Sequence, residues 1–137
     1  MKRYLIIAVL MVSLALAGCS SAGNPPVVAA AYEDISVETL AGMMNERRDS
    51  FLLVNTIDFH LANIPTTDHQ IPFDQLENNL DILPPDKDAE IVLYCRSGNK
   101  SALAAEVLIN QGYTNVKNLV GGILNWHESG LPLILEP

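Results

Sequence analysis

Three short apolar runs separated by segments of helical composition constrain the fold of this chain more than any other feature. The runs are residues 51–54, 91–94 and 116–120. The first two are too uniformly apolar to leave one face in water, which is typical of strands buried in a parallel sheet, and the third, which is mostly apolar, suggests a third strand. The segments of helical composition are residues 37–48, 73–80, 101–110 and 122–129. This alternation predicts an α/β fold, a small parallel β-sheet flanked by helices on both faces.

Local signals support the first helix and mark a long loop after the first apolar run. Ser36 can accept hydrogen bonds from the free N–H groups of a helix that starts after it, and Glu38 stands where the helix dipole favours an acid. The predicted apolar face of this helix consists of Val37, Leu40, Met43 and Met44. Residues 55–72 are polar and contain two prolines, so we expect them to be largely loop.

The N-terminal segment, residues 1–18, has the pattern of a secretory signal. Two basic residues precede an apolar run that is shorter than the roughly 20 residues needed for a membrane-spanning helix. The run ends in Leu-Ala-Gly followed by Cys19, which resembles the lipobox of bacterial lipoproteins. The resemblance implies cleavage before Cys19 and a diacylglycerol on its sulfur. The alternative is an ordinary signal followed by a chance cysteine.

This interpretation divides the chain into a signal peptide (1–18), a lipidated tether (19–31) and one folded domain (32–137). Residues 20–31 carry no charge and no long-period pattern, as expected of a tether. The expected location is the bacterial cell envelope, on the periplasmic side, with membrane attachment through lipid on Cys19. The resemblance to bacterial lipoproteins also implies, with Ser20 rather than Asp after the cysteine, sorting to the outer membrane if the cell is Gram-negative.

Charge and cysteine usage limit the classes of function. The formal net charge of −8 argues against nucleic acid as a partner, because phosphate binding needs a basic face. The chain has two cysteines, and if Cys19 carries lipid then Cys95 has no partner for an internal disulfide. A leftover cysteine in a secreted protein is a candidate reactive thiol, and the alternative is an inert buried one.

The segment that follows the second apolar run carries the chemistry. It places Cys95 at the carboxyl end of a predicted strand and just before a helix, where α/β proteins form their ligand sites. Free N–H groups of such a loop can cradle an anion, and the helix dipole together with Arg96 and Lys100 favours thiolate. Gly98 permits a positive φ. A thiolate in an anion cradle suits attack on the electrophilic sulfur of an anionic substrate.

Two motifs of this chain resemble those of the single-domain rhodanese (sulfurtransferase) family. The segment from Cys95 to Ser101, Cys-Arg-Ser-Gly-Asn-Lys-Ser, resembles the family's active loop Cys-Arg-Ser-Gly-x-Arg-Ser, with Lys100 in place of the second Arg. Downstream, Gly-Gly-Ile-Leu-Asn-Trp and Gly-Leu-Pro-Leu resemble the family's ending Gly-Gly-x-x-x-Trp…Gly-x-Pro-Leu. The resemblance covers roughly residues 33–135.

The resemblance implies a sulfurtransferase in which Cys95 is the catalytic residue. Cys95 would take a sulfane sulfur from a small anionic donor such as thiosulfate, form a persulfide, and pass the sulfur to cyanide or a thiol. The implied substrate-binding residues are Arg96, Ser97, Gly98, Asn99, Lys100 and Ser101. No metal and no cofactor is implied. Because Lys lacks the planar fork of Arg, we expect weak thiosulfate turnover or a different donor.

The early part of the family pattern is altered here. Asn55 stands where the family has Asp, and Asn63 stands where it has His. Asn55 could preserve hydrogen bonds but cannot pair with a cation. Asp58 and His60 lie in a loop that could border the site and orient a substrate.

Two other functions and several blander roles complete the sequence-based predictions. A cysteine phosphatase needs Arg six positions after its cysteine, where this chain has Ser101, so that class is disfavoured. A catalytically weak binding or persulfide-carrier module at the envelope remains the alternative. The histidines show no metal-ligand spacing, and Trp126 is expected to pack in the core.

Overall fold

The computed structural model describes residues 31–59 and 62–135. The predictions for the signal peptide, for Cys19, for nearly all of the tether and for His60 lie outside the described residues. Within the described ranges, no helix has both the length and the apolar character that crossing a membrane requires.

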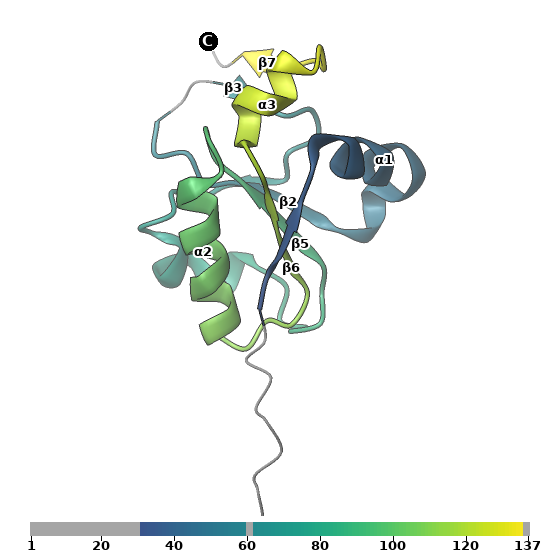
Figure 1. The fold of residues 1–137 in the computed structure, drawn as a ribbon. Coiled ribbons are helices and arrows are strands. Elements are labelled where there is room, and N and C mark those ends of the chain that lie inside the picture. Colours follow the sequence, from purple (N-terminus) through teal and green to yellow (C-terminus); the bar gives the residue numbers. More distant parts are fainter. Residues whose placement is uncertain (1–30, 60–61, 136–137) are drawn as a thin grey trace, which may run out of the picture.

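Five parallel strands form the central sheet in the order β1-β6-β5-β2-β4 (Figure 1). Their bounds are Glu33–Ile35 (β1), Leu52–Asn55 (β2), His69–Gln70 (β4), Ile91–Tyr94 (β5) and Val116–Leu119 (β6). All four pairings between neighbouring strands are parallel. Strands β2, β5 and β6 correspond to the three apolar runs, so the predicted α/β class with a parallel sheet is confirmed.

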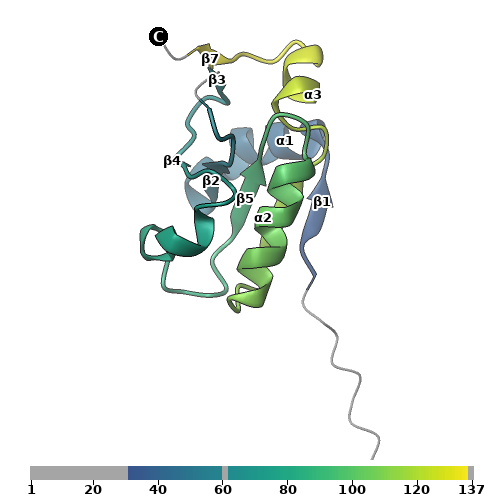
Figure 2. The same cartoon turned by 90° about the vertical axis from the view of Figure 1, so that its left-hand side faces the viewer.

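Helices cover both faces of this sheet. They are α1 (Val37–Arg47), α2 (Asn99–Asn110), α3 (Gly122–Glu128) and the 3₁₀ helices η1 (Arg48–Ser50) and η2 (Leu76–Ile82). Figure 1 shows α1 and α2 on opposite sides of the sheet, and Figure 2, turned by 90°, shows α2 in front of it. The predicted cap of α1 is present, because the Ser36 hydroxyl accepts a hydrogen bond from the Thr39 N–H at 3.2 Å.

The strand β5 shows why its residues had to be apolar throughout. Val92 and Tyr94 belong to the core layer that packs against α1 and α3. Ile91 and Leu93 belong to the layer that packs against α2 and η2. Since successive side chains of a strand point to opposite faces, every residue of this strand faces one of the two apolar layers.

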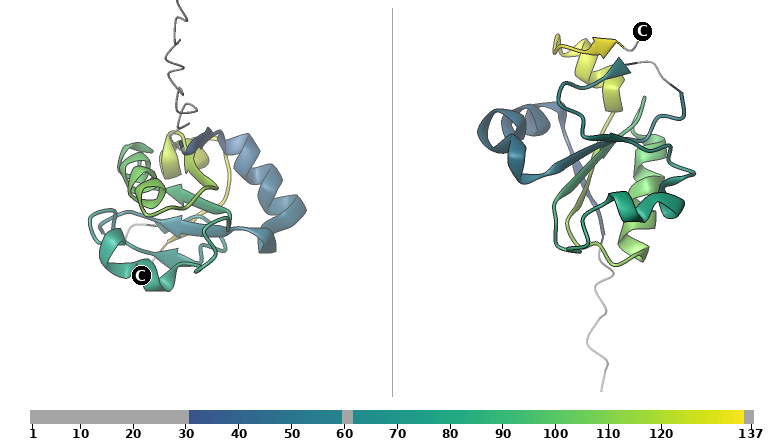
Figure 3. Two further views of the ribbon diagram at one scale, coloured as in Figure 1. Left: turned by 90° about the horizontal axis from the view of Figure 1, so that it is seen from below. Right: turned by 180° about the vertical axis from the view of Figure 1, so that it is seen from behind.

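The region 55–72 is less loop-like than its composition predicts. It contains β4, which extends the central sheet through pairing of Val54 with His69, and a two-residue strand, β3 (Ala62–Asn63). Strand β3 pairs antiparallel with β7 (Ile134–Leu135), close to α3 (Figure 3). Strands of two or three residues, β1 included, are too short to produce a periodic pattern, so they were not predicted from the sequence.

Candidate active site

The sulfur of Cys95 lies at the carboxyl end of β5, beneath the loop that leads into α2. Cys95 is only 2% exposed, and Gly98 follows with a φ of 90°. A Cβ at Gly98 would stand 2.9 Å from the Gly121 nitrogen and 3.0 Å from the Leu119 carbonyl oxygen. Glycine is therefore needed here both for its conformation and for the close approach of the next strand-helix connection.

Hydrogen bonds converge on the Cys95 sulfur. The Gly98 N–H donates to Sγ at 3.1 Å, and the Ser101 hydroxyl lies 3.4 Å away in donor geometry. Burial raises the pKa of the Cys95 thiol, but hydrogen bonds from Ser101, Ser97 and Gly98 favour the thiolate and together lower the pKa below its ordinary value. The structure thus supplies a thiol that is easier to ionise than a free cysteine.

A chain of polar side chains, which starts buried behind the sulfur and ends at the exposed Asp34, was not foreseen from the sequence. The Ser101 hydroxyl lies 2.7 Å from the Asn118 side-chain oxygen, and the Asn118 amide donates to the Asp34 carboxylate at 2.7 Å. Ser101 is fully buried and Asn118 is 4% exposed. Because Asp34 fixes which end of the Asn118 amide faces Ser101, this chain sets the direction in which the Ser101 hydroxyl points.

The second sequence motif contacts the first. The N–H groups of Ile123 and Leu124, at the start of α3, donate to the carbonyl oxygens of Cys95 and Arg96 at 2.9 and 3.1 Å. Gly122 lies so close to the loop that a Cβ there would stand 2.2 Å from the Cys95 oxygen. The Gly-Gly pair therefore lets the first turn of α3 hold the backbone of the Cys95 loop.

A cavity of about 300 Å³ opens over Cys95. One wall is the Cys95 loop, and the other is Ile57, Asp58 and Phe59, which follow β2. Arg96, Ser97 and Asn99 are exposed around the mouth, and Lys100 is half-buried. Gly98 and Ser101 are buried beneath the loop. The structure therefore brings together all seven predicted site residues and also Asp58.

Two side chains contact Lys100, Asp58 from the opposite wall and Phe73. The Lys100 ammonium lies 2.7 Å from the Asp58 carboxylate and 5.0 Å from the centre of the Phe73 ring. The hydrogen bond from Lys100 lowers the pKa of Asp58, so this carboxylate is charged at neutral pH. Of the two cations that the sequence analysis placed at the thiolate, one is already paired.

The two departures from the family pattern are bonded to each other. The Asn55 amide donates to the Asn63 side-chain oxygen at 2.8 Å, and the Ile57 N–H donates to the Asn55 oxygen at 2.9 Å. Asn55 is 1% exposed. A neutral amide pair thus links β2 and β3, and Asn55 keeps its hydrogen bonds as expected.

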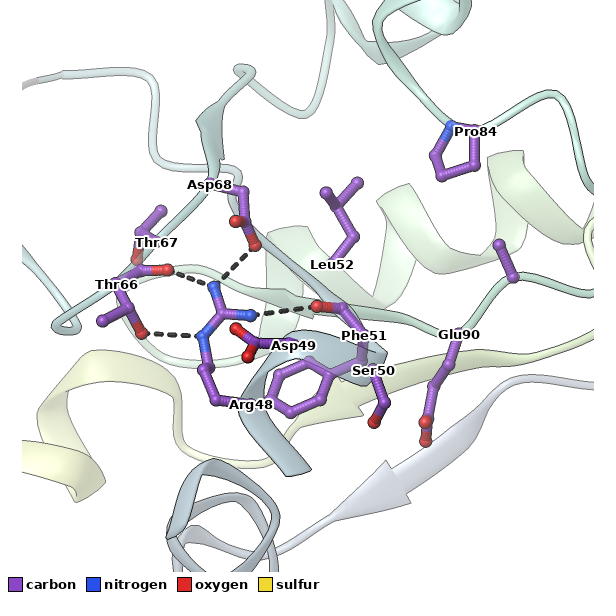
Figure 4. Close-up of a pocket in the computed structure, with 11 residues that line it drawn as sticks. Arg48, Asp49, Ser50, Phe51, Leu52, Thr66, Thr67, Asp68, Pro84 and Glu90 are labelled. Atoms are coloured by element: carbon purple, nitrogen blue, oxygen red, sulfur yellow. Dashed lines mark hydrogen bonds and ion pairs between the residues drawn. The ribbon is translucent and has the colours of Figure 1, made fainter. Parts of the chain in front are cut away.

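A larger hollow of about 790 Å³ lies at the opposite end of the strands, next to the residues that precede β2 and β5. Figure 4 shows that Arg48 is bound there by its own surroundings. Its guanidinium donates to the Thr66 hydroxyl and carbonyl, to the Phe51 carbonyl and to Asp68. Because these groups satisfy one another and no cysteine lines this hollow, the smaller cavity at Cys95 is the better candidate site.

Trp126 has a structural role. Trp126 is 3% exposed and donates its indole N–H to the Pro132 carbonyl at 2.9 Å, as expected for core packing. Among residues 31–59 and 62–135, no three His, Cys, Asp or Glu side chains cluster in a way that could hold a metal ion.

Comparison with known proteins shows which family this chain resembles. Residues 56–129 match the family described as the rhodanese-like domain. A sulfurtransferase of Allochromatium vinosum is 33% identical over 102 residues, covering 74% of this chain and 94% of that protein. An adenylyltransferase and sulfurtransferase of Lodderomyces elongisporus is 30% identical over 104 residues, covering 69% of this chain but 23% of that protein. The crystal structure of a rhodanese-related protein from Thermoplasma volcanium superposes with a TM-score of 0.62 at 26% identity, covering 77% of this chain and 100% of that one.

Proposed function

The chain belongs to the rhodanese-like domain family, and from that premise we propose that it transfers sulfane sulfur through a persulfide on Cys95. Its relatives include proteins named sulfurtransferases, which supports sulfur transfer in general. The observation that carries the specific proposal is the Cys95 sulfur itself, which is buried, held by loop hydrogen bonds and open to a cavity. The same loop would bind the donor.

The proposed reaction has two steps. In the first, the Cys95 thiolate attacks the outer sulfur of a donor such as thiosulfate, the S–S bond of the donor breaks, and sulfite leaves with the bonding electrons. In the second, an acceptor such as cyanide or a thiol attacks the outer sulfur of the persulfide and releases the Cys95 thiolate. The N–H groups that surround Sγ suit both the thiolate and the persulfide anion, because each accepts hydrogen bonds.

Replacement of Cys95 tests this proposal. In a Cys95→Ala variant of the full chain we expect no thiocyanate from cyanide and any donor. In the wild type, exposure to a sulfane-sulfur donor should add the mass of one sulfur atom to the peptide that contains Cys95. Activity that survives in Cys95→Ala, or a wild type that neither turns over nor gains sulfur with several donors, would exclude the proposal.

A persulfide carrier or binding module with weak turnover is the second candidate. The paired Lys100 favours it, because its ion pair with Asp58 reduces the positive charge available to a donor. The Asn55–Asn63 pair departs from the family pattern in the segment that supports the site. Such a module would gain sulfur on Cys95 but release it slowly to cyanide. Single-turnover persulfide formation compared with steady-state thiocyanate production separates the two functions.

The location remains part of the proposal as well. The signal-like start and Cys19 support a lipoprotein that presents this domain in the bacterial envelope, on the periplasmic side. Sulfur donors and thiol acceptors of that compartment would then be its substrates.

A further inference from the structure

The charges around the cavity mouth are balanced in a way that bears on which donor the site accepts. Arg96 and Lys100 bring two positive charges to the Cys95 loop, and Asp58 brings one negative charge to the opposite wall. The Lys100 ammonium points to Asp58, 2.7 Å away, rather than standing unpaired. With Cys95 as thiolate, the formal charges of these four groups cancel.

A donor with two negative charges gains little in such a cavity. Before it can bind Lys100 it must displace the Asp58 carboxylate, and it then lies beside that carboxylate and the thiolate. The repulsion between the donor and these two anions is proportional to the donor's charge, so a singly charged donor experiences about half of it. The Asp58–Lys100 pair is partly exposed, with side chains 40% and 43% accessible, so a ligand can reach it.

The cavity also offers apolar surface. Ile57 and Phe59 line it together with Asp58, and Phe59 is 51% exposed. An exposed aromatic ring at the entrance of a charged pocket suits an organic substituent, which thiosulfate lacks.

We propose that Asp58 is a specificity-determining residue, which directs the site away from dianionic thiosulfate and toward organic sulfur donors that carry a single negative charge. This inference rests on the proposed sulfur transfer and names its donor class as organic thiosulfonates and persulfides. With a thiosulfonate, the Cys95 thiolate attacks the outer sulfur, the donor S–S bond breaks, and an organic sulfinate leaves with the electron pair. The products are the Cys95 persulfide anion and the sulfinate, so atoms and charge balance.

The test compares two donors that differ by one charge, thiosulfate and methanethiosulfonate, in the wild type and in Asp58→Asn. Wild type should show the higher kcat/KM with methanethiosulfonate. In Asp58→Asn we expect kcat/KM for thiosulfate to rise roughly three- to tenfold and that for methanethiosulfonate to rise less. Equal changes for both donors, or no change for thiosulfate, would overturn the inference.

A matched control separates a local effect from the change in net charge. Asp49 is exposed and precedes β2, whereas Asp58 follows it, so the strand separates Asp49 from the cavity. Asp49→Asn changes the net charge of the protein by the same amount and should leave the preference between the two donors unaltered. A shift of equal size in Asp49→Asn would also refute a specific role for Asp58.

Alkylation of Cys95 gives a readout that does not depend on sulfur transfer. Iodoacetate is anionic and iodoacetamide is neutral, and both react with the same thiolate. The ratio of their rate constants cancels any change in the Cys95 pKa, and it should rise several-fold in Asp58→Asn and fall back toward the wild-type ratio in high salt. If the ratio rises while no donor gives turnover, the charge selection stands and the proposed function fails. If turnover is normal and neither ratio moves, the inference alone fails.

Discussion

At the scale of single residues, burial and hydrogen bonding have opposite effects on the pKa of Cys95. A thiol that is 2% exposed would ordinarily resist ionisation, because a buried charge loses its hydration. Donors from Gly98 and Ser101 reverse that outcome. The Ser101 hydroxyl carries a single hydrogen, and Asn118 competes for it at 2.7 Å.

The Ser101 contribution can be measured directly. Ser101→Ala removes one donor to the sulfur and leaves burial unchanged, so the pKa of Cys95 should rise. The wild-type thiol should therefore alkylate rapidly at a pH below the free-cysteine range, and the variant profile should move to higher pH. Iodoacetamide rates measured across pH give both profiles, and superimposable curves would show that the backbone N–H groups alone support the thiolate.

At the scale of elements, the first turn of α3 acts as a clamp on the Cys95 loop. Two of its N–H groups bind carbonyls of Cys95 and Arg96, although the two segments are far apart in the sequence. The approach is possible only because Gly122, with a φ of 57°, has no side chain. This contact explains why the loop motif and the Gly-Gly motif occur together.

Two glycine substitutions probe that clamp. Gly122→Ala places a methyl group 2.2 Å from the Cys95 oxygen, so it should lower the free energy of unfolding by about 2 to 4 kcal/mol and reduce activity. Gly42→Ala is the matched control, because Gly42 lies inside α1 and a Cβ added there would have no heavy atom from the rest of the fold within 4 Å. It should raise stability by about 0.5 to 1 kcal/mol. Urea unfolding measures both, and a Gly122→Ala protein as stable as wild type would contradict the clamp.

At the scale of the whole molecule, the sheet separates two apolar layers, and the Cys95 cavity lies at the carboxyl ends of its central strands. Four segments gather at this end of the sheet (Figure 3). They are the two motifs, the loop after β2 and the β3–β7 pair. The described chain starts with residue 31 next to β1, so a lipid on Cys19 would leave the domain on a short tether.

The proposed anchor makes a prediction for the full chain expressed in a Gram-negative cell. Wild type and Cys95→Ala should sediment with membranes, whereas Cys19→Ser should not be retained there by lipid. Fractionation by ultracentrifugation, with mass spectrometry of the N-terminal peptide, checks this outcome. Recovery of wild type in the soluble periplasmic fraction would favour an ordinary signal peptide.

The sequence by itself predicted the buried strands β2, β5 and β6 and the loop of Cys95. These signals are local, since an apolar run such as residues 51–54 or 91–94 already demands cover on two faces, and residues 95–101 are contiguous. The sequence did not predict β1, β3, β4 and β7. Two or three residues become a strand only when a distant partner supplies the hydrogen bonds.

Long-range contacts decided the rest of the site. Nothing in the neighbouring residues indicates that Asn118 reaches Ser101 or that Asp34 binds Asn118. Nothing near Asp58 indicates that it pairs with Lys100. The sequence thus determined the fold class and the candidate nucleophile, whose signals lie in adjacent residues. Only the tertiary structure decided the electrostatic surroundings of that nucleophile, because Coulomb and hydrogen-bond energies depend on distance in space rather than on separation along the chain.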